Sequence, residues 1–370
     1  MHKLTKNGKK LTRSTNLRCL CVAGSVILTL AALWYLQRLL MPKYQKGVVE
    51  GSMIEEYYLS EEPHEVIFLG DCEVYENIST VTLFEEYGIS SYIRGSAQQL
   101  TWQSYYLLED TLRYETPKVV VFNVLALKYG EPQSESYNRM TLDGMRWSSS
   151  KIASIEASMT EDEHMIDYVF PFLRYHSRWS ELTATDFEHV FSKDRVTTNG
   201  YYMRADVLPE GAFPDPMPLA DYTLPDTSME YLEMMYELCE ENDIELVLIK
   251  APTLYPYWYE QWDDQVDEFA DAHGIPYINY IYLRDAMGLD MSEDTYDAGL
   301  HLNLSGAEKF ASYIGQYLIN NYDLTDFRQY ADVAGEWEDD ILFYDSLRQA
   351  QEAELSEYGE LRSWGANAIE

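Results

Sequence analysis

The stretch VIFLGDC at residues 66–72 decides the fold class of this chain. Its first five residues form a short apolar run that ends in Gly70, the pattern of a strand buried on both faces. Two polar residues, Asp71 and Cys72, follow at once. A side chain on the turn after such a strand is held rigidly and exposed at the edge of the sheet. The stretch therefore predicts a buried strand with a candidate nucleophile, Cys72, directly beyond its end.

Similar apolar runs recur along the chain and alternate with helical patterns. We expect further strands at 91–94 (SYIR), 118–125 (KVVVFNVL), 245–250 (ELVLIK) and 276–280 (PYINY), and helices at 101–113, 228–241, 257–273 and 305–318, the last capped by Ser305. Strands that alternate with helices predict an α/β fold with a mostly parallel sheet covered on both faces. Ligands of such sheets bind beyond the carboxyl ends of the strands.

Two long segments interrupt or follow this alternation. Residues 129–227 are too many for a connecting loop and are rich in Tyr, Trp, Met and Arg, so we expect an inserted cap over the strand ends. Residues 323–370 form an acidic C-terminal tail with a helical stretch near 337–355. The pattern leaves open whether this tail packs on the domain.

The N-terminal region has the pattern of a membrane anchor. Residues 19–36 (CLCVAGSVILTLAALWYL) carry no charge, and six Lys or Arg residues precede them. This length suffices for a spanning helix, and the positive excess predicts a cytoplasmic tail at 1–18, a transmembrane segment at 19–41 and a main domain, 49–322, outside the cytoplasm. A cleaved signal peptide would need a small-x-small site, and none follows the apolar run. We therefore expect a single-pass protein of the cell membrane.

Charge and cysteine content exclude several classes of function. The formal net charge is −36, and nine of the 27 basic residues lie in residues 1–48, so the remainder holds 18 basic and 63 acidic residues, a net of −45. Such a field argues against nucleic acid as a partner, because its binding depends on phosphate neutralisation. Only Cys72 and Cys239 lie outside the apolar segment, too few for a disulfide framework. No Cys/His spacing indicates a metal site.

A second motif lies between the last predicted strand and the last predicted helix. It reads DAGLHLN at residues 297–303. A histidine in this position, His301, can act as general base, with a nearby aspartate to orient it. The residues leave two candidates for that aspartate, Asp297 and Asp294.

Four motifs in this order resemble those of the SGNH/GDSL hydrolases. They are FLGDC at 68–72, Arg94-Gly95-Ser96, Asn123 after VVVF, and DAGLHLN at 297–303. The closer likeness is to membrane-anchored bacterial members, such as DltD-type D-alanyl transfer proteins and exopolysaccharide O-acetyltransferases. The resemblance covers residues 64–128 and 228–320 and implies a flavodoxin-like, three-layer fold.

The resemblance also implies roles for individual residues. Cys72 takes the place of the family's serine nucleophile, His301 that of the base, and Asp297 that of the orienting acid. Gly95 and Asn123 would complete an oxyanion hole with the backbone N–H of Cys72. A neighbouring His301 is expected to lower the pKa of the thiol from its reference of about 8.5. The chain departs from the family in its cysteine, in one additional residue between Asp297 and His301, and in the absence of a glycine before Asn123.

These implications lead to two hypotheses about function. In the first, the protein is an esterase or acyltransferase that acts on cell-surface glycans without a cofactor, and its partners are a surface polysaccharide, an acyl donor and a membrane-bound O-acyltransferase. In the second, it is an inactive SGNH-like glycan-binding or scaffold protein of the cell envelope. Cys72 would then be a buried small residue or half of a disulfide with Cys239. The two differ in whether Cys72 and His301 lie within hydrogen-bonding reach.

Overall fold

The computed structural model describes residues 6–42, 52–191, 195–211, 215–253 and 257–363. Contacts between Cα atoms divide the chain into two compact units. The first combines the N-terminal helix with the segment that begins at Ile166 and ends before Arg195, and the second holds the rest of the chain.

The second unit is built on a five-stranded parallel sheet, as the alternating pattern predicts. Its strands are β1 (Val66–Gly70), β2 (Ser91–Gly95), β3 (Val119–Asn123), β4 (Glu245–Lys250) and β5 (Tyr277–Asn279), in the order β2-β1-β3-β4-β5. This is the flavodoxin-like strand order, in which the chain changes direction between β1 and β3. The carboxyl ends of β1 and β3 therefore flank the crevice where ligands of such sheets bind.

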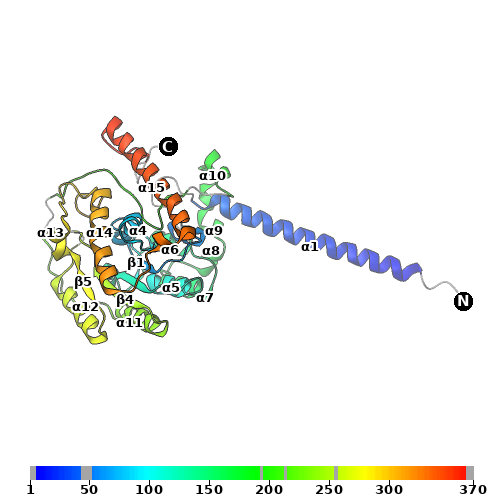
Figure 1. Cartoon of the computed structure of the whole chain (residues 1–370). Coiled ribbons are helices and arrows are strands. Elements are labelled where there is room, and N and C mark those ends of the chain that lie inside the picture. The colour runs from blue at the N-terminus through cyan, green and yellow to red at the C-terminus, as the bar shows by residue number, and fades with distance from the viewer. Residues whose placement is uncertain (1–5, 43–51, 192–194, 212–214, 254–256, 364–370) are drawn as a thin grey trace. The chain divides into compact units, whose positions relative to one another are not determined.

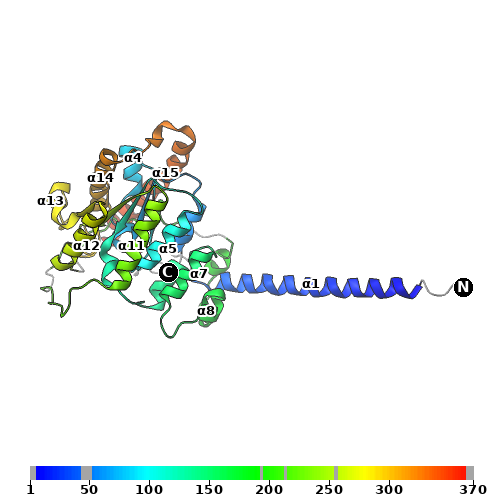
Figure 2. The ribbon, with the colours of Figure 1, turned by 90° about the horizontal axis from the view of Figure 1, so that it is seen from below.

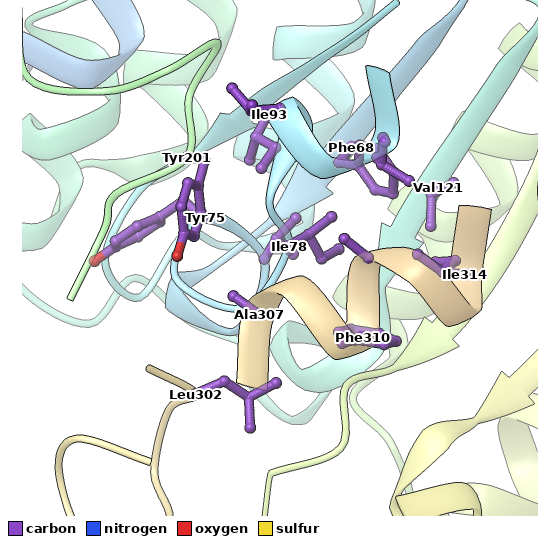
Figure 3. Close-up of a cluster of buried hydrophobic side chains, with 14 of the residues drawn as sticks. Phe68, Tyr75, Ile78, Ile93, Val121, Tyr201, Leu302, Ala307, Phe310 and Ile314 are labelled. Carbon is purple, nitrogen blue, oxygen red and sulfur yellow. The ribbon is translucent and has the colours of Figure 1, made fainter. Parts of the chain in front are cut away.

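Helices cover both faces of the sheet (Figure 2). On one face lie α4 (Thr80–Tyr87) and α14 (Leu304–Asn321), and on the other α5 (Thr101–Thr111) packs with α11 (Asp226–Glu241), while α12 (Glu260–His273) contacts β5. Figure 3 shows Phe310 and Ile314 of α14 near Phe68 of β1 and Val121 of β3. All four side chains are completely buried. This layer of the core holds the N-terminal end of α14, and thus the loop before it, close to the end of β1.

The cap of α14 differs from the expected one. Asn303 precedes the helix, and its side chain accepts a hydrogen bond from the Gly306 N–H at 3.1 Å. Ser305 lies inside the helix, where its hydroxyl donates to Asp294 at 2.7 Å. Asparagine satisfies an unpaired N–H of a first turn as well as serine does, so the pattern misplaced the helix cap by two residues.

The acidic tail packs on the second unit. After a short turn it forms α15 (Ala331–Tyr358), in which Trp337 is completely buried. The indole stacks on the Phe84 ring of α4 with centroids 4.5 Å apart and planes 4° from parallel. The tail is thus a part of the α4–α14 face of the domain.

The segment expected as one cap is divided between the two units. Its first part forms α6 (Glu135–Leu142) and α7 (Ser149–Ser158), and α7 packs on α5, where the Trp102 indole N–H donates to Ser158 at 3.0 Å. Its last part returns to the site end of the sheet, where the Tyr202 N–H donates to the carbonyl of Tyr75 at 2.7 Å.

The middle part belongs to the first unit. It contains α8 (Met165–Val169), α9 (Phe172–Tyr175) and α10 (Ala184–Glu188), and Figure 1 shows these helices at the C-terminal end of α1 (Lys6–Leu40). Within α1, residues Asn16–Leu40 have a mean hydropathy of 2.1, and by length and composition they can cross a membrane.

Candidate active site

The turn after β1 presents Cys72 because of Gly70 and Asp71. Gly70 has φ +149°, and a Cβ at this position would lie 2.6 Å from a methyl group of Val74, so only glycine fits. Asp71 caps the short helix α3 (Cys72–Tyr75) by accepting a hydrogen bond from the Glu73 N–H at 3.2 Å. Cys72 is therefore the first residue of α3, where it is partly exposed and carries a free thiol.

His301 reaches this thiol from the loop before α14. The Cys72 thiol and the His301 imidazole lie close enough for each to influence the pKa of the other. On its other side the imidazole Nδ1 lies 2.6 Å from Asp297 Oδ2, and the His301 backbone N–H donates to Asp297 Oδ1 at 2.8 Å. Since Nδ1 is occupied by the carboxylate, Nε2 is the ring nitrogen available to the thiol. The three side chains follow one another in the order that nucleophile, base and acid take in a catalytic triad.

The competing aspartate has another role. Asp294 is completely buried and accepts hydrogen bonds from the Lys309 ammonium at 2.6 Å and from the Asp290 N–H at 2.8 Å. Its interactions hold the loop and the first turns of α14 together. Asp297 is thus the aspartate that orients His301 in this structure.

Glu76 is a second carboxylate on His301, and no sequence motif predicted it. Its Oε2 lies 3.3 Å from His301 Nδ1, and the same atom accepts a hydrogen bond from the Tyr296 hydroxyl. Tyr296 stacks on the imidazole with ring centroids 5.9 Å apart. The available signal was spacing, because Glu76 follows Cys72 by four residues, one helical turn.

These neighbours determine how the site titrates. Burial lowers the pKa of His301, but Glu76, Cys72 and Asp297 outweigh it and raise that pKa well above its usual value. Burial raises the pKa of Glu76. Burial also raises the pKa of Cys72 to about 11, and the proximity of His301 only partly opposes this shift. The expectation of a lowered thiol pKa was therefore wrong, because desolvation of the thiolate dominates.

The two residues expected in the oxyanion hole, Gly95 and Asn123, lie in different environments. Gly95 ends β2 directly opposite Gly70, next to the Cys72 turn. Asn123 ends β3 but is completely buried, and its amide group donates to Asp71 at 3.2 Å and to Glu73 at 3.0 Å. Both N–H bonds of the amide are therefore engaged within the protein. An oxyanion role for Asn123 would require one of these bonds to break.

A buried ion pair supports the turn that carries Cys72. Lys250, at the end of β4, donates to both carboxylate oxygens of Glu73 at 2.8 Å, and both side chains are fully buried. Thr253 donates to the same carboxylate. Removing one partner of such a pair leaves an uncompensated charge, which typically costs about 3–5 kcal/mol. The network explains how a short α3 is held in one position beneath Cys72.

Lys128 brings positive charge to the site. It ends the short 3₁₀ helix after β3, Val124–Lys128, and is partly buried. Burial lowers its pKa, and the electrostatic influence of Asp71, Glu73 and Cys72 opposes this shift. A cation beside a nucleophile can stabilise negative charge that develops during attack. Within the described parts of the chain, no group of three or more His, Cys, Asp or Glu residues could hold a metal ion.

Comparisons with known proteins give only distant structural likeness. No protein-family model matches the chain, and no curated protein matches it. The chain is similar to a crystal structure described as a candidate acylhydrolase from Bacteroides fragilis, with 12% identity and a TM-score of 0.36 over 73% of this chain and 95% of that one. It is also similar to a GDSL-like lipase from Bacteroides thetaiotaomicron, with 14% identity and a TM-score of 0.34 over 72% and 95% of the two chains.

Proposed function

We propose that the second unit is an acyl esterase or acyltransferase that uses Cys72 as a covalent nucleophile. The observation that supports this most directly is the proximity of the Cys72 thiol to His301, whose imidazole is in turn hydrogen-bonded to Asp297. It lies at the carboxyl end of β1, beside the point where the strand order reverses. That is where ligands of flavodoxin-like sheets bind.

The raised pKa of the thiol decides how the first step proceeds. With a pKa of about 11, Cys72 is protonated at neutral pH, so attack requires simultaneous proton removal. His301 Nε2 takes the thiol proton as Sγ bonds to the ester carbonyl carbon. The tetrahedral intermediate collapses, the C–O bond breaks, and His301 returns the proton to the departing alcohol. Water or a second hydroxyl then attacks the acyl-thioester carbonyl carbon while His301 takes its proton. The C–S bond breaks as His301 gives that proton to the departing sulfur of Cys72.

The substrate class belongs to the same proposal. An anchored enzyme outside the cytoplasm meets surface glycans, and the family resemblance favours their O-acyl groups as substrates. A donor complex in the membrane, such as an O-acyltransferase, would supply the acyl group if the reaction is transfer. The strongly acidic chain favours neutral or basic acceptors over phosphate-rich ones, because like charges repel.

One observation favours the alternative of an inactive glycan-binding protein. Asn123 has both amide N–H bonds engaged, so the expected oxyanion hole retains only the backbone N–H groups of Cys72 and Gly95 and the nearby charge of Lys128. A site without adequate oxyanion stabilisation loses about 10²–10³ in rate for each missing donor. Activity measurements therefore have to separate the two proposals.

The test uses the purified full-length chain and an activated acetyl ester. We expect an acyl adduct on Cys72 by mass spectrometry, and a fall in rate of at least about a hundredfold in Cys72→Ala and His301→Ala. Cys72→Ser should retain part of the rate. Cys239→Ala is the matched control, because that cysteine is buried in α11. An unchanged rate in Cys72→Ala contradicts the nucleophile assignment, and inactive wild-type protein that still binds glycan supports the alternative.

A further inference from the structure

Six large apolar side chains in the first unit are exposed although they belong to an ordered segment. They are Ile166, Val169, Leu173, Trp179, Phe187 and Phe191. Phe191 is 73% exposed and Trp179 is 68% exposed. Soluble surfaces rarely gather this many apolar groups in so short a segment, and such a concentration marks contact with a protein or a membrane. We call residues 166–191 the interfacial segment.

The interfacial segment is attached to the C-terminal end of α1. The Arg38 guanidinium donates to the carbonyl of Val190 at 2.5 Å. The Arg178 guanidinium donates to the carbonyl of Leu40 at 2.9 Å and to Asp186, also at 2.9 Å. These bonds satisfy a terminal carbonyl of α1 and fix the segment at one end of that helix.

Aromatic contacts show the level that the segment reaches along α1. The Phe191 ring lies 5.8 Å from that of Trp34 and 6.4 Å from that of Tyr35. Trp34 precedes the end of α1 at Leu40 by six residues, which corresponds to about 9 Å of helix rise. The uncharged run ends at Leu36, so Phe191 lies at the level where apolar residues give way to charged ones. Trp and Tyr at that level form the aromatic belt of membrane helices.

We propose that the interfacial segment lies in the membrane–water interface beside α1, with its exposed apolar side chains in the lipid. This inference rests on the proposal that α1 spans the membrane. Lipid is the favoured occupant because the neighbouring surface of α1 is itself exposed and apolar, with Val26, Ile27 and Leu30 more than half exposed. The carboxylates and guanidinium groups of the segment would remain on the aqueous side. The segment thus adds a shallow contact with the bilayer beside α1.

A depth measurement on the full-length chain tests this proposal. Cys19, Cys21, Cys72 and Cys239 are replaced by Ser, and single cysteines are introduced by Trp179→Cys, Phe191→Cys, Ile27→Cys and Leu342→Cys. Each carries an environment-sensitive fluorophore in phosphatidylcholine vesicles whose lipids bear a nitroxide either near the headgroup or deep in the acyl chain. Leu342 is the control, because it is 66% exposed on α15 of the second unit.

The outcomes separate this inference from the anchor on which it rests. We expect the shallow nitroxide to quench fluorophores at 179 and 191 at least twofold more than one at 342, and the deep nitroxide to quench most at 27. If the fluorophore at 27 is quenched but those at 179 and 191 are quenched no more than the one at 342, the inference about the interfacial segment is overturned and the anchor stands. No quenching at 27 overturns the anchor, and the inference with it.

A second measurement uses the native indole in place of a label. Brominated lipids should quench part of the tryptophan fluorescence of the wild-type protein in vesicles. Trp179→Phe should reduce that quenched part, whereas Trp147→Phe, which removes an exposed indole of the second unit, should not. Equal effects of the two substitutions contradict the proposal.

Discussion

At the scale of single residues, the most consequential feature is the pair of carboxylates on one side of His301. Asp297 and Glu76 lie 2.6 and 3.3 Å from Nδ1. Both favour the imidazolium and raise the pKa of His301 well above its usual value. The base form exists only above the raised pKa of His301. Catalysis by this site should therefore increase with pH on the alkaline side of an ordinary histidine titration.

Glu76→Gln tests this arrangement. The substitution removes one negative charge and keeps a polar side chain, so the pKa of His301 falls and the base form persists to lower pH. We expect the acid limb of kcat/KM to move down by about 1–3 pH units. The measurement is a pH–rate profile with an activated ester, and the limb belongs to the coupled pair of Glu76 and His301.

Asp297→Asn is the matched control for this experiment. It removes the carboxylate that orients the ring, so we expect the rate to fall at every pH, in addition to any shift. An acid limb that stays in place in folded Glu76→Gln contradicts the role assigned to Glu76.

At the scale of elements, α15 is a helix whose structural role is not evident from the sequence. It belongs to an acidic tail, yet Trp337 is buried against Phe84, and Tyr344 donates a hydrogen bond to Glu308 of α14 at 2.8 Å. These contacts attach α15 to α4 and α14, the helices that cover one face of the sheet. Because the loop that carries His301 leads directly into α14, the tail supports the site from a distance.

Trp337→Ala should reveal this support. The substitution removes a fully buried indole, and truncations of this kind cost about 3–5 kcal/mol in the free energy of unfolding. Urea denaturation at equilibrium, monitored by far-UV circular dichroism, measures the loss. Trp147→Ala removes an exposed indole and should change the free energy of unfolding little. Equal stability of Trp337→Ala and the wild type would show that α15 is not part of the folded domain.

At the scale of the whole molecule, the chain consists of a unit with a candidate active site and a unit with a candidate membrane helix. The sequence of the first of these is interrupted by a segment that belongs to the second. The five strands and the Cys72 site lie in the second unit. The interfacial segment, although inserted between elements of that unit, groups with α1. Removal of α1 therefore takes away the partner of the segment and leaves every strand of the sheet in the chain.

Expression of residues 49–370 tests this division. Its start lies outside the described residues, but it keeps every strand, so we expect a cooperative unfolding transition. The interfacial segment loses α1, and its apolar side chains should drive self-association, measured by light scattering after size-exclusion chromatography. Trp179→Ser with Phe187→Ser and Phe191→Ser should restore the monomer. A fragment without a cooperative transition contradicts the division into two units.

Local sequence patterns predicted the sheet and the proximity of Cys72 and His301 beside it. Apolar runs of five or six residues between turn residues can be satisfied only by burial in a sheet, so β1 and β4 lie at the predicted positions. The order of the motifs similarly pointed to Cys72 and His301, because the carboxyl ends of parallel strands meet at one edge.

Contacts between elements distant in sequence establish which groups complete the site and where the inserted segment belongs. Glu76 meets Tyr296 across 220 residues of chain, and no local pattern records that distance. The choice of Asp297 over Asp294 depends on loop geometry, and the engagement of Asn123 depends on where Glu73 lies beneath it. Periodicity along a chain reports which side chains are buried. Which buried or exposed groups meet is set by packing between elements that are distant in sequence, and that information exists only in the folded molecule.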